Sequence, residues 1–266
     1  MNNDCVVLFP VYRPLDEGER NVIRRALGMT PGFEARFIAP HSFVPDGSFA
    51  GFENVAAERF DDRFFDGIPG YNRLMLDPDF YGRFRDFKYV LIHQTDAYIF
   101  KPELRQWCDR GWDYIGAPWY KRQKLARYDA LQKRFWKHKS PGSCKYLLRQ
   151  ARYNNVGNGG FSLRRTETFM KVLAGADPEL LAKYRSDGDS IRNEDVFWGI
   201  QARGILPGYR VPDWREGLLF SVERRPGRSF EVLGDALPFG CHAYRKIEPE
   251  VWRKFIHAEY FSDAKV

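Results

Sequence analysis

The sequence has few cysteines and no long apolar run. Its four cysteines, Cys5, Cys108, Cys144 and Cys241, are far apart, and no two of them form a C-x-x-C pair. This pattern argues against a disulfide framework and against a zinc site, so we expect reduced thiols in an intracellular protein. No apolar run approaches the ~20 residues that cross a bilayer. The first residues also lack the basic segment of a secretory leader, so we expect a cytoplasmic location.

Two common nucleotide-binding motifs are missing as well. The sequence contains no G-x-x-x-x-G-K-[ST] element and no G-x-G-x-x-G between a strand and a helix. Their absence disfavours a P-loop NTPase and a Rossmann dehydrogenase. Hydrophobic residues make up 44% of the 266-residue chain and aromatic residues 16%. This composition excludes collagen-like, coiled-coil and disordered classes and predicts a globular fold.

Positive charge is concentrated in one segment. The formal net charge is +7, but residues 121–152 contain eleven basic residues against the single acid Asp129, so this segment carries +10 and the remainder −3. Ser140-Pro141-Gly142 divides the segment, which predicts two helices in a basic insertion at about 120–153. Such a segment is either a solvated helical face or a surface that attracts nucleic acid, a phosphorylated substrate or an anionic membrane.

Short apolar runs alternate with stretches of helical periodicity along the chain. Strands are predicted at 5–9, 36–39, 54–60, 88–92, 112–115, 161–164 and 239–244. Helices are predicted at 17–27, 166–173, 178–184 and 194–202, and another begins at 70–76 and leads to Phe87. This alternation predicts one α/β domain over 1–266, with a mostly parallel central sheet flanked by helices. Ligands bind such sheets at the carboxyl ends of the strands, so polar residues that follow strands are candidates for the site.

Four motifs carry candidate functional residues. Asp96 follows an apolar strand and either caps a turn or holds a divalent cation, because hard cations prefer oxygen ligands. The glycines within 157–160 either form a tight turn or let a sugar or phosphate approach the backbone. The acids Glu194 and Asp195 open a helix, where they are either caps or a general base. His242 is either a core residue or a ligand.

Taken in order, these motifs resemble a known family. The segments YVLIHQTDAYIF, YIGAPW, VGNGGFSLR, NEDVFW and PFGCHAY, between Tyr89 and Tyr244, are together similar to a family catalogued as domain of unknown function 5672. That family is regarded as glycosyltransferase-like, and VVLFPVYRP near the start of the chain fits its first nucleotide-binding strand. The resemblance implies a single, Rossmann-like domain of the GT-A glycosyltransferase type.

The resemblance also implies roles for individual residues. Gln94-Thr95-Asp96 stands in the place of an Asp-x-Asp motif, and Asp96 and His242 are then the expected ligands of Mn²⁺ or Mg²⁺. Gln94 replaces the first acid of that motif, which weakens the expected hold on a cation. Asp195, preceded by Glu194, corresponds to the acid that activates the acceptor. The other expected donor-binding residues are Pro10, Val11, Tyr12, Arg13, Asn72, Arg73, Gly159 and Gly160.

The activity implied by the resemblance is inverting transfer of a hexose from a nucleotide sugar, with UDP as the expected nucleotide. The expected acceptor is a hydroxyl group of a glycan or lipid-linked glycan in surface polysaccharide synthesis, and segment 121–152 would contact an anionic membrane at its inner face. A retaining transferase on the same fold is an alternative in which Asp195 is not the base. A basic nucleic-acid-binding α/β module is another, but it leaves Asp195 and His242 without a role, so we expect no nucleic-acid partner.

Overall fold

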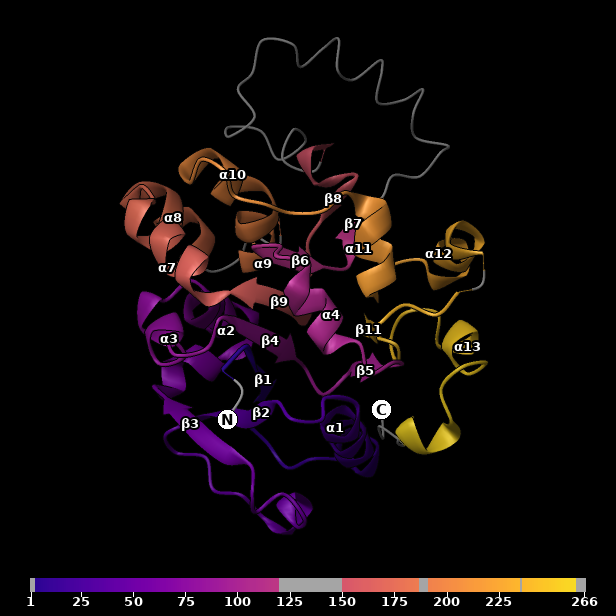
Figure 1. The fold of residues 1–266 in the computed structure, drawn as a ribbon. Coiled ribbons are helices and arrows are strands. Elements are labelled where there is room, and N and C mark those ends of the chain that lie inside the picture. Colours follow the sequence, from indigo (N-terminus) through magenta and orange to yellow (C-terminus); the bar gives the residue numbers. More distant parts are fainter. Residues whose placement is uncertain (1–2, 120–149, 187–190, 235, 262–266) are drawn as a thin grey trace.

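The computed structural model describes residues 3–119, 150–186, 191–234 and 236–261 (Figure 1). Cys144 and most of the predicted basic insertion lie outside these ranges. Cys5, Cys108 and Cys241 are buried free thiols. None of the helices within the described ranges combines the length and the apolarity needed to cross a bilayer.

A six-stranded sheet forms the centre of the fold, in the order β3-β2-β1-β4-β9-β6. Strands β3, β2, β1 and β4 pair in parallel, and β9 runs antiparallel to both of its neighbours, β4 and β6. Five strands therefore share one direction, and the predicted mostly parallel sheet is confirmed. The bounds are β1 Cys5–Pro10, β2 Glu34–Pro40, β3 Ala56–Phe60, β4 Tyr89–His93, β6 Tyr114–Gly116 and β9 Phe161–Arg165.

Helices cover both faces of this sheet, and each face has its own hydrophobic core (Figure 1). Along β1, Val6 and Leu8 pack in the core beneath α2, α3, α7 and α8, whereas Val7 and Phe9 pack in the core beneath α1 and α4. Because both faces are covered, the run of β1 is apolar throughout rather than alternating. The helix bounds are α1 Glu17–Met29, α2 Gly67–Met75, α3 Pro78–Gly82, α4 Leu104–Asp109, α7 Thr166–Gly175 and α8 Pro178–Arg185.

Two smaller sheets connect segments that are distant in the sequence. Strand β5 (Ala97–Ile99) follows β4 closely and pairs antiparallel with β11 (Gly240–His242), which pairs in parallel with β10 (Ser221–Val222). Strand β7 (Pro118–Trp119) pairs with β8 (Asn155–Val156). The register of β5 and β11 sets His242 opposite Ala97, so the loop after β4 meets the late histidine.

The single helix predicted at 194–202 is wrong, because this stretch is divided into three parts. Helix α9 (Glu194–Val196) is followed by a π-helical turn at Phe197–Gln201 and by α10 (Ala202–Ile205). A Cβ atom on Gly199 would come 2.4 Å from the Val156 carbonyl oxygen, so the missing side chain lets β8 approach the wider turn. Further helical elements that were not predicted are α11 Trp214–Phe220, α12 Pro226–Leu233, α13 Pro249–Trp252 and 3₁₀ turns at Gly47–Phe49, Asp62–Phe65 and Ala258–Tyr260.

Candidate active site

Gln94 and Asp96 meet His242 just beyond the end of β4. The Nε2 atom of His242 lies 3.1 Å from Oδ1 of Asp96 and 3.0 Å from Oε1 of Gln94. Lys246 approaches from solvent, with its Nζ atom 3.2 Å from Oδ2 of Asp96 and its side chain 77% exposed. The structure therefore brings the expected metal ligands Asp96 and His242 together with the Gln94 side chain of the same motif.

The charges of this cluster favour an imidazolium beside a carboxylate. Burial lowers the pKa of His242, but Asp96 and Glu223 outweigh it and raise that pKa to about 10. Burial raises the pKa of Asp96, whereas His242 and Lys246 lower it by more, so this carboxyl stays ionised well below its usual range. Glu223 faces the other ring nitrogen, with Oε1 3.7 Å from Nδ1 of His242.

The donor atoms around His242 fit a hard divalent cation. They are a carboxylate oxygen, an amide oxygen and an imidazole nitrogen, and neighbouring ligands of an octahedral ion with bonds of about 2.1 Å stand about 3 Å apart. The distances from Nε2 to Asp96 and Gln94 match that spacing. Glu223 stands where a carboxylate commonly orients a metal-bound imidazole. Gln94 would supply a neutral amide oxygen, and no three His, Cys, Asp or Glu side chains form a metal cluster within the described ranges.

The glycine turn separates this cluster from the acid pair. A Cβ atom on Gly160 would lie 2.2 Å from Nε2 of His242, and one on Gly159 would lie 1.7 Å from Oε1 of Glu194. A side chain at either position would displace a residue of the site. Asn158 precedes them in the left-handed region, with φ 61°, a conformation that asparagine tolerates better than most residues. Consecutive glycines therefore hold His242 and Glu194 on two sides of one turn.

Helix α2 positions the acid pair through Asn72. Its Oδ1 accepts the Glu194 N–H at 3.1 Å, and its Nδ2 donates to Oδ1 of Asn193 at 3.4 Å. The first N–H groups of a helix have no partner within that helix, and the side chain of Asn193 does not cap α9. Asn72 therefore serves as the cap. Asn72 thus lies beside the acids, whereas Arg73 donates to the Arg63 carbonyl at 3.4 Å.

Glu194 is buried against Arg164, whose side chain is fully buried. The Nη2 atom of Arg164 lies 3.1 Å from Oε1 of Glu194 and 3.3 Å from the Gly159 carbonyl oxygen, and Nη1 donates to the Tyr81 hydroxyl at 2.9 Å. Burial raises the pKa of Glu194 to about 7, and Arg164 offsets only part of this shift. The second oxygen of Glu194, Oε2, is buried without a hydrogen-bond partner among the described residues.

Asp195 is the more accessible of the two acids, because its side chain is only partly buried. Its Oδ1 atom is enclosed and has no hydrogen-bond partner in the described part of the chain. Burial raises the pKa of Asp195, Glu223 adds to the shift, and Arg152 opposes it. Arg152 in turn lies over the Trp119 ring, with Cζ 4.5 Å from the ring centroid. Asp195 therefore combines access from outside with a raised pKa.

Glu19 ties together residues that were expected to bind the nucleotide. Arg13 donates to both of its carboxylate oxygens, at 2.7 and 2.9 Å, and the Thr95 hydroxyl donates to Oε1 at 2.7 Å. Glu19 is itself buried, so it links the loop after β1 to the loop after β4. The side chain of Arg13 is 53% exposed and Tyr12 is 58% exposed, which leaves both open to a ligand, while Pro10 and Val11 are buried.

The sequence motifs did not indicate four further residues of this site: Arg164, Glu19, Glu223 and Lys246. Arg164 ends the quoted motif VGNGGFSLR, and Glu19 completes a D-x-x-E capping box at the start of α1, so both left a local signal. Glu223 and Lys246 left none, because only the pairing of β11 with β5 and β10 brings them to Asp96 and His242.

Burial of Glu194 predicts a pH-dependent contribution to stability. Its pKa is about 7 in the folded chain against an ordinary 4.5, so the folded chain binds this proton more tightly than the unfolded chain. The contribution of Glu194 to the free energy of unfolding should then fall as the pH rises from 4.5 to 7, by about 3 kcal/mol. Glu194→Gln mimics the protonated acid. We expect urea unfolding to show that the native chain loses stability relative to Glu194→Gln as the pH rises from 4.5 to 8.

The matched control for this measurement is Glu17→Gln, on the exposed first turn of α1. Its effect on the free energy of unfolding should not vary with pH by more than a few tenths of a kcal/mol. A difference between the native chain and Glu194→Gln that stays constant from pH 4.5 to 8 would contradict the raised pKa of Glu194.

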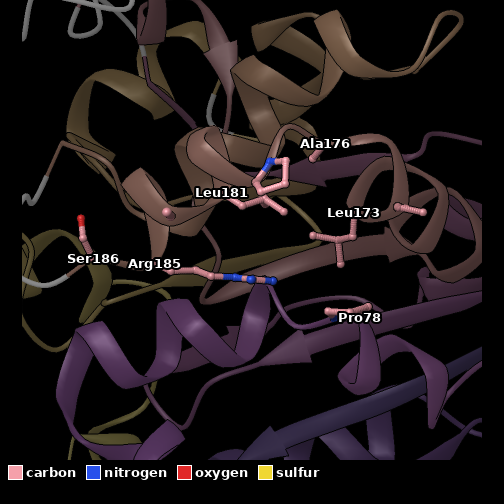
Figure 2. Close-up of a pocket in the computed structure, with 9 residues that line it drawn as sticks. Pro78, Leu173, Ala176, Leu181, Arg185 and Ser186 are labelled. Carbon is pink, nitrogen blue, oxygen red and sulfur yellow. The ribbon is translucent and has the colours of Figure 1, made fainter.

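A groove of about 630 Å³ lies elsewhere, between α3, α7 and α8 (Figure 2). Figure 2 shows Arg185 extended along it, and the Nη2 atom of this residue donates to the Leu76 carbonyl. Among the described residues, Arg185 is the only charged side chain that lines it, and none of the predicted site residues does so. It therefore lacks the chemistry found around His242.

Solved structures of glycosyltransferases have a similar fold. An active-site mutant of LgtC has a TM-score of 0.51 and 14% identity, with 89% of this chain and 86% of that chain covered. Mouse xyloside xylosyltransferase 1 has a TM-score of 0.54 and 14% identity, with 90% and 97% covered. The bifunctional glycosyltransferase WbbM has a TM-score of 0.50 and 13% identity, with 94% and 47% covered. The expected GT-A fold is thereby confirmed, and identities this low show the fold alone.

Comparison with sequence families agrees with the motifs. No curated protein matches the chain. The family model described as "Protein of unknown function (DUF5672)" matches residues 54–242, more than half of the chain. The matched range includes the loop after β4, the glycine turn and the acid pair, and it ends at His242. The chain therefore belongs to the DUF5672 family and has a GT-A glycosyltransferase fold.

Proposed function

We propose that this protein is a nucleotide-sugar glycosyltransferase, one GT-A-like domain over 1–266 with a basic insertion at about 120–153. In this proposal it transfers a hexose from UDP to a hydroxyl group of a glycan or lipid-linked glycan, with inversion. One observation carries the proposal: the Gln94–Asp96–His242 cluster and the acid pair are held on two sides of a single glycine turn. A glycosyl transfer needs charge stabilisation for the leaving diphosphate on one side of the sugar and a base on the other.

Asp195 is the proposed base. It takes the proton of the acceptor hydroxyl while the acceptor oxygen attacks the anomeric carbon, and the bond from that carbon to the diphosphate oxygen breaks with its electron pair leaving on the diphosphate. A base works best when its pKa lies near the working pH, and burial moves the pKa of Asp195 in that direction. Glu194 is already engaged with Arg164, which supports Asp195 as the reactive acid.

The leaving diphosphate is proposed to bind at Asp96, Gln94 and His242. These residues would hold Mn²⁺ or Mg²⁺, which neutralises charge on a departing diphosphate. His242 must release its proton to bind a cation, and Glu223 on its other nitrogen keeps the ring oriented. Lys246, exposed beside Asp96, adds a positive charge at the same place. Tyr12 and Arg13 are open toward solvent and would contact the nucleotide.

The basic segment 121–152 is proposed to contact an anionic membrane, at the cytoplasmic face, or a lipid-diphosphate acceptor. Arg152, the last residue of this segment, contacts the Trp119 ring and interacts electrostatically with Asp195, so the segment ends beside the proposed base. The acceptor would then be a lipid-linked glycan of surface polysaccharide synthesis. Replacing four of the basic residues should weaken sedimentation with anionic vesicles, and unchanged sedimentation would contradict this part of the proposal.

Thermal unfolding against a nucleotide panel tests the function. A ligand at ~100 times its dissociation constant adds about 2.7 kcal/mol, a shift of several degrees for a chain of this size. We expect UDP with Mn²⁺ to raise the melting temperature of the native chain and to lose this effect in Asp96→Asn. Asp177→Asn, which keeps a cap at α8, is the control and should respond like the native chain.

Other outcomes of this experiment separate the alternatives. A UDP shift that needs no metal would keep the transferase and assign the diphosphate charge to basic side chains such as Lys246. No shift with any nucleotide, together with salt-sensitive binding to oligonucleotides, would overturn the transferase in favour of a nucleic-acid-binding module.

A further inference from the structure

Besides Oδ1 of Asp195, two buried oxygen atoms at the acid pair have no hydrogen-bond partner among the described residues. They are the hydroxyl oxygen of Tyr71 and Oε2 of Glu194. A buried polar atom without a partner costs about 1–3 kcal/mol, so folded proteins rarely keep one without a reason. Two such atoms in one neighbourhood indicate that something outside the chain supplies their partners.

The two residues lie between the two halves of the site. Tyr71 precedes Asn72 on α2, the residue that accepts the Glu194 N–H. The Tyr71 hydroxyl interacts electrostatically with Glu194 and Arg164 and lies beside Gln94, without a hydrogen bond of good geometry. Gln94 in turn contacts His242. Tyr71 therefore stands between the cluster proposed for the diphosphate and the acids proposed for the acceptor.

The chemistry of the pair selects the kind of ligand. A phenol both donates and accepts a hydrogen bond, and a carboxylate oxygen accepts one. Arg164 holds Oε1 of Glu194, so the direction of Oε2 is set by the fold. Neighbouring hydroxyl groups of a sugar can donate to Oε2 and accept from Tyr71 at the same time. A phosphate would be repelled by Glu194, and an apolar ligand would leave both atoms unpaired.

We propose that Tyr71 and Glu194 form the subsite that binds the hydroxyl groups of the transferred sugar and selects among hexoses. This inference rests on the proposed function, in which the sugar spans the distance from the diphosphate to Asp195. Gly159 is needed for this subsite, because a Cβ atom at that position would collide with Oε1 of Glu194. Tyr71 contributes to specificity, while the nucleotide is bound by other residues.

Tyr71→Phe tests the subsite, because it removes one oxygen atom and keeps the ring. Calorimetric titration would compare UDP, UDP-glucose, UDP-galactose and UDP-N-acetylglucosamine, and GDP with GDP-mannose, on native and variant chains. We expect the preferred sugar nucleotide to bind about tenfold more weakly to Tyr71→Phe and its advantage over epimers to shrink. Affinity for the bare nucleotide should change less than about twofold.

Tyr209→Phe is the matched control. The Tyr209 hydroxyl is also buried without a hydrogen-bond partner in the described ranges, but it lies after α10 beside Asp113 and Arg203. This variant should leave every affinity unchanged. Melting temperatures complete the comparison, since removing an unpaired hydroxyl should leave each variant as stable as the native chain or slightly more so.

Three other outcomes would contradict the subsite, and the last of them would also contradict the proposed function. If Tyr71→Phe binds the sugar nucleotides like the native chain, a buried water satisfies these atoms and the subsite is overturned while the transferase stands. If it weakens the bare nucleotide and the sugar nucleotide equally, Tyr71 acts on the nucleotide and the subsite is again overturned. If the native chain binds neither a bare nucleotide nor any sugar nucleotide, both the subsite and the proposed function fail.

Discussion

Asp195→Asn is expected to lower kcat by about 10²- to 10⁴-fold, the range that general-base catalysis supplies. The side chain keeps its shape and loses only its ability to take a proton. Oδ1 of Asp195 is enclosed without a hydrogen-bond partner among the described residues, so the neutral amide should not cost stability. We therefore expect an unchanged or slightly higher melting temperature and a nucleotide-sugar KM within about threefold of the native value, measured by initial rates of transfer.

Asp213→Asn is the control for this prediction. Asp213 caps α11 through the N–H groups of Arg215 and Glu216, and asparagine caps equally well, so activity should be retained. The anomeric configuration of the product, read by NMR, separates the two mechanisms. An inverted product with a loss of kcat supports Asp195 as the base. A retained product, with most of kcat left in Asp195→Asn, would contradict that role and favour the retaining alternative.

Arg164→Met is expected to lower the free energy of unfolding by about 3–5 kcal/mol, the usual loss when one partner of a buried ion pair is removed. Arg164 is fully buried and joins Glu194, the Gly159 carbonyl and the Tyr81 hydroxyl, so its loss leaves several polar groups without a partner. For a chain of this size the melting temperature should fall by roughly 10 °C. Calorimetry at pH 8, where Glu194 is ionised, measures the effect.

Two further variants define the origin of this loss. Arg164→Met combined with Glu194→Gln should recover part of the stability, because no carboxylate is then left unpaired and neighbouring sites do not add independently. Arg24→Met removes a half-exposed arginine that pairs with Glu17 on α1 and should cost less than about 1 kcal/mol. If the double variant is as unstable as the sum of its single changes, the ion pair is not the cause.

Local patterns predicted most elements of the central sheet. The apolar runs at 5–9 and 88–92 became β1 and β4, since strands covered on both faces need apolar residues throughout. Helix α1 was readable from its spacing of Val22, Ile23 and Ala26, which are all buried. The stretch 194–202 was misread because its apolar spacing suits an α-helix, whereas Gly199 and the approach of β8 belong to a π-helical turn.

The motifs predicted where the site lies but not which role each of its residues has. Asp96, His242, Gly159, Gly160 and the acid pair were all named from residue types that follow strands or open a helix, and the structure brings them together. Asn72 was expected in the donor pocket, and the structure shows that its side chain caps α9. Neither the spacing nor the composition could show this, because the contact joins residues more than a hundred positions apart.

By itself the sequence determined the α/β class, the carboxyl-end position of the candidate residues and the family, because these follow from short-range periodicity and from motifs of a few residues. Only the tertiary structure determined which acid is held in a buried ion pair and which is accessible. Arg164 reaches Glu194 because β9 lies beside β4 in the sheet and α9 packs against the same core, so one carboxylate is buried in an ion pair while Asp195 stays accessible. Burial and ion pairing depend on distances between helices and strands, and no local sequence pattern predicts those distances.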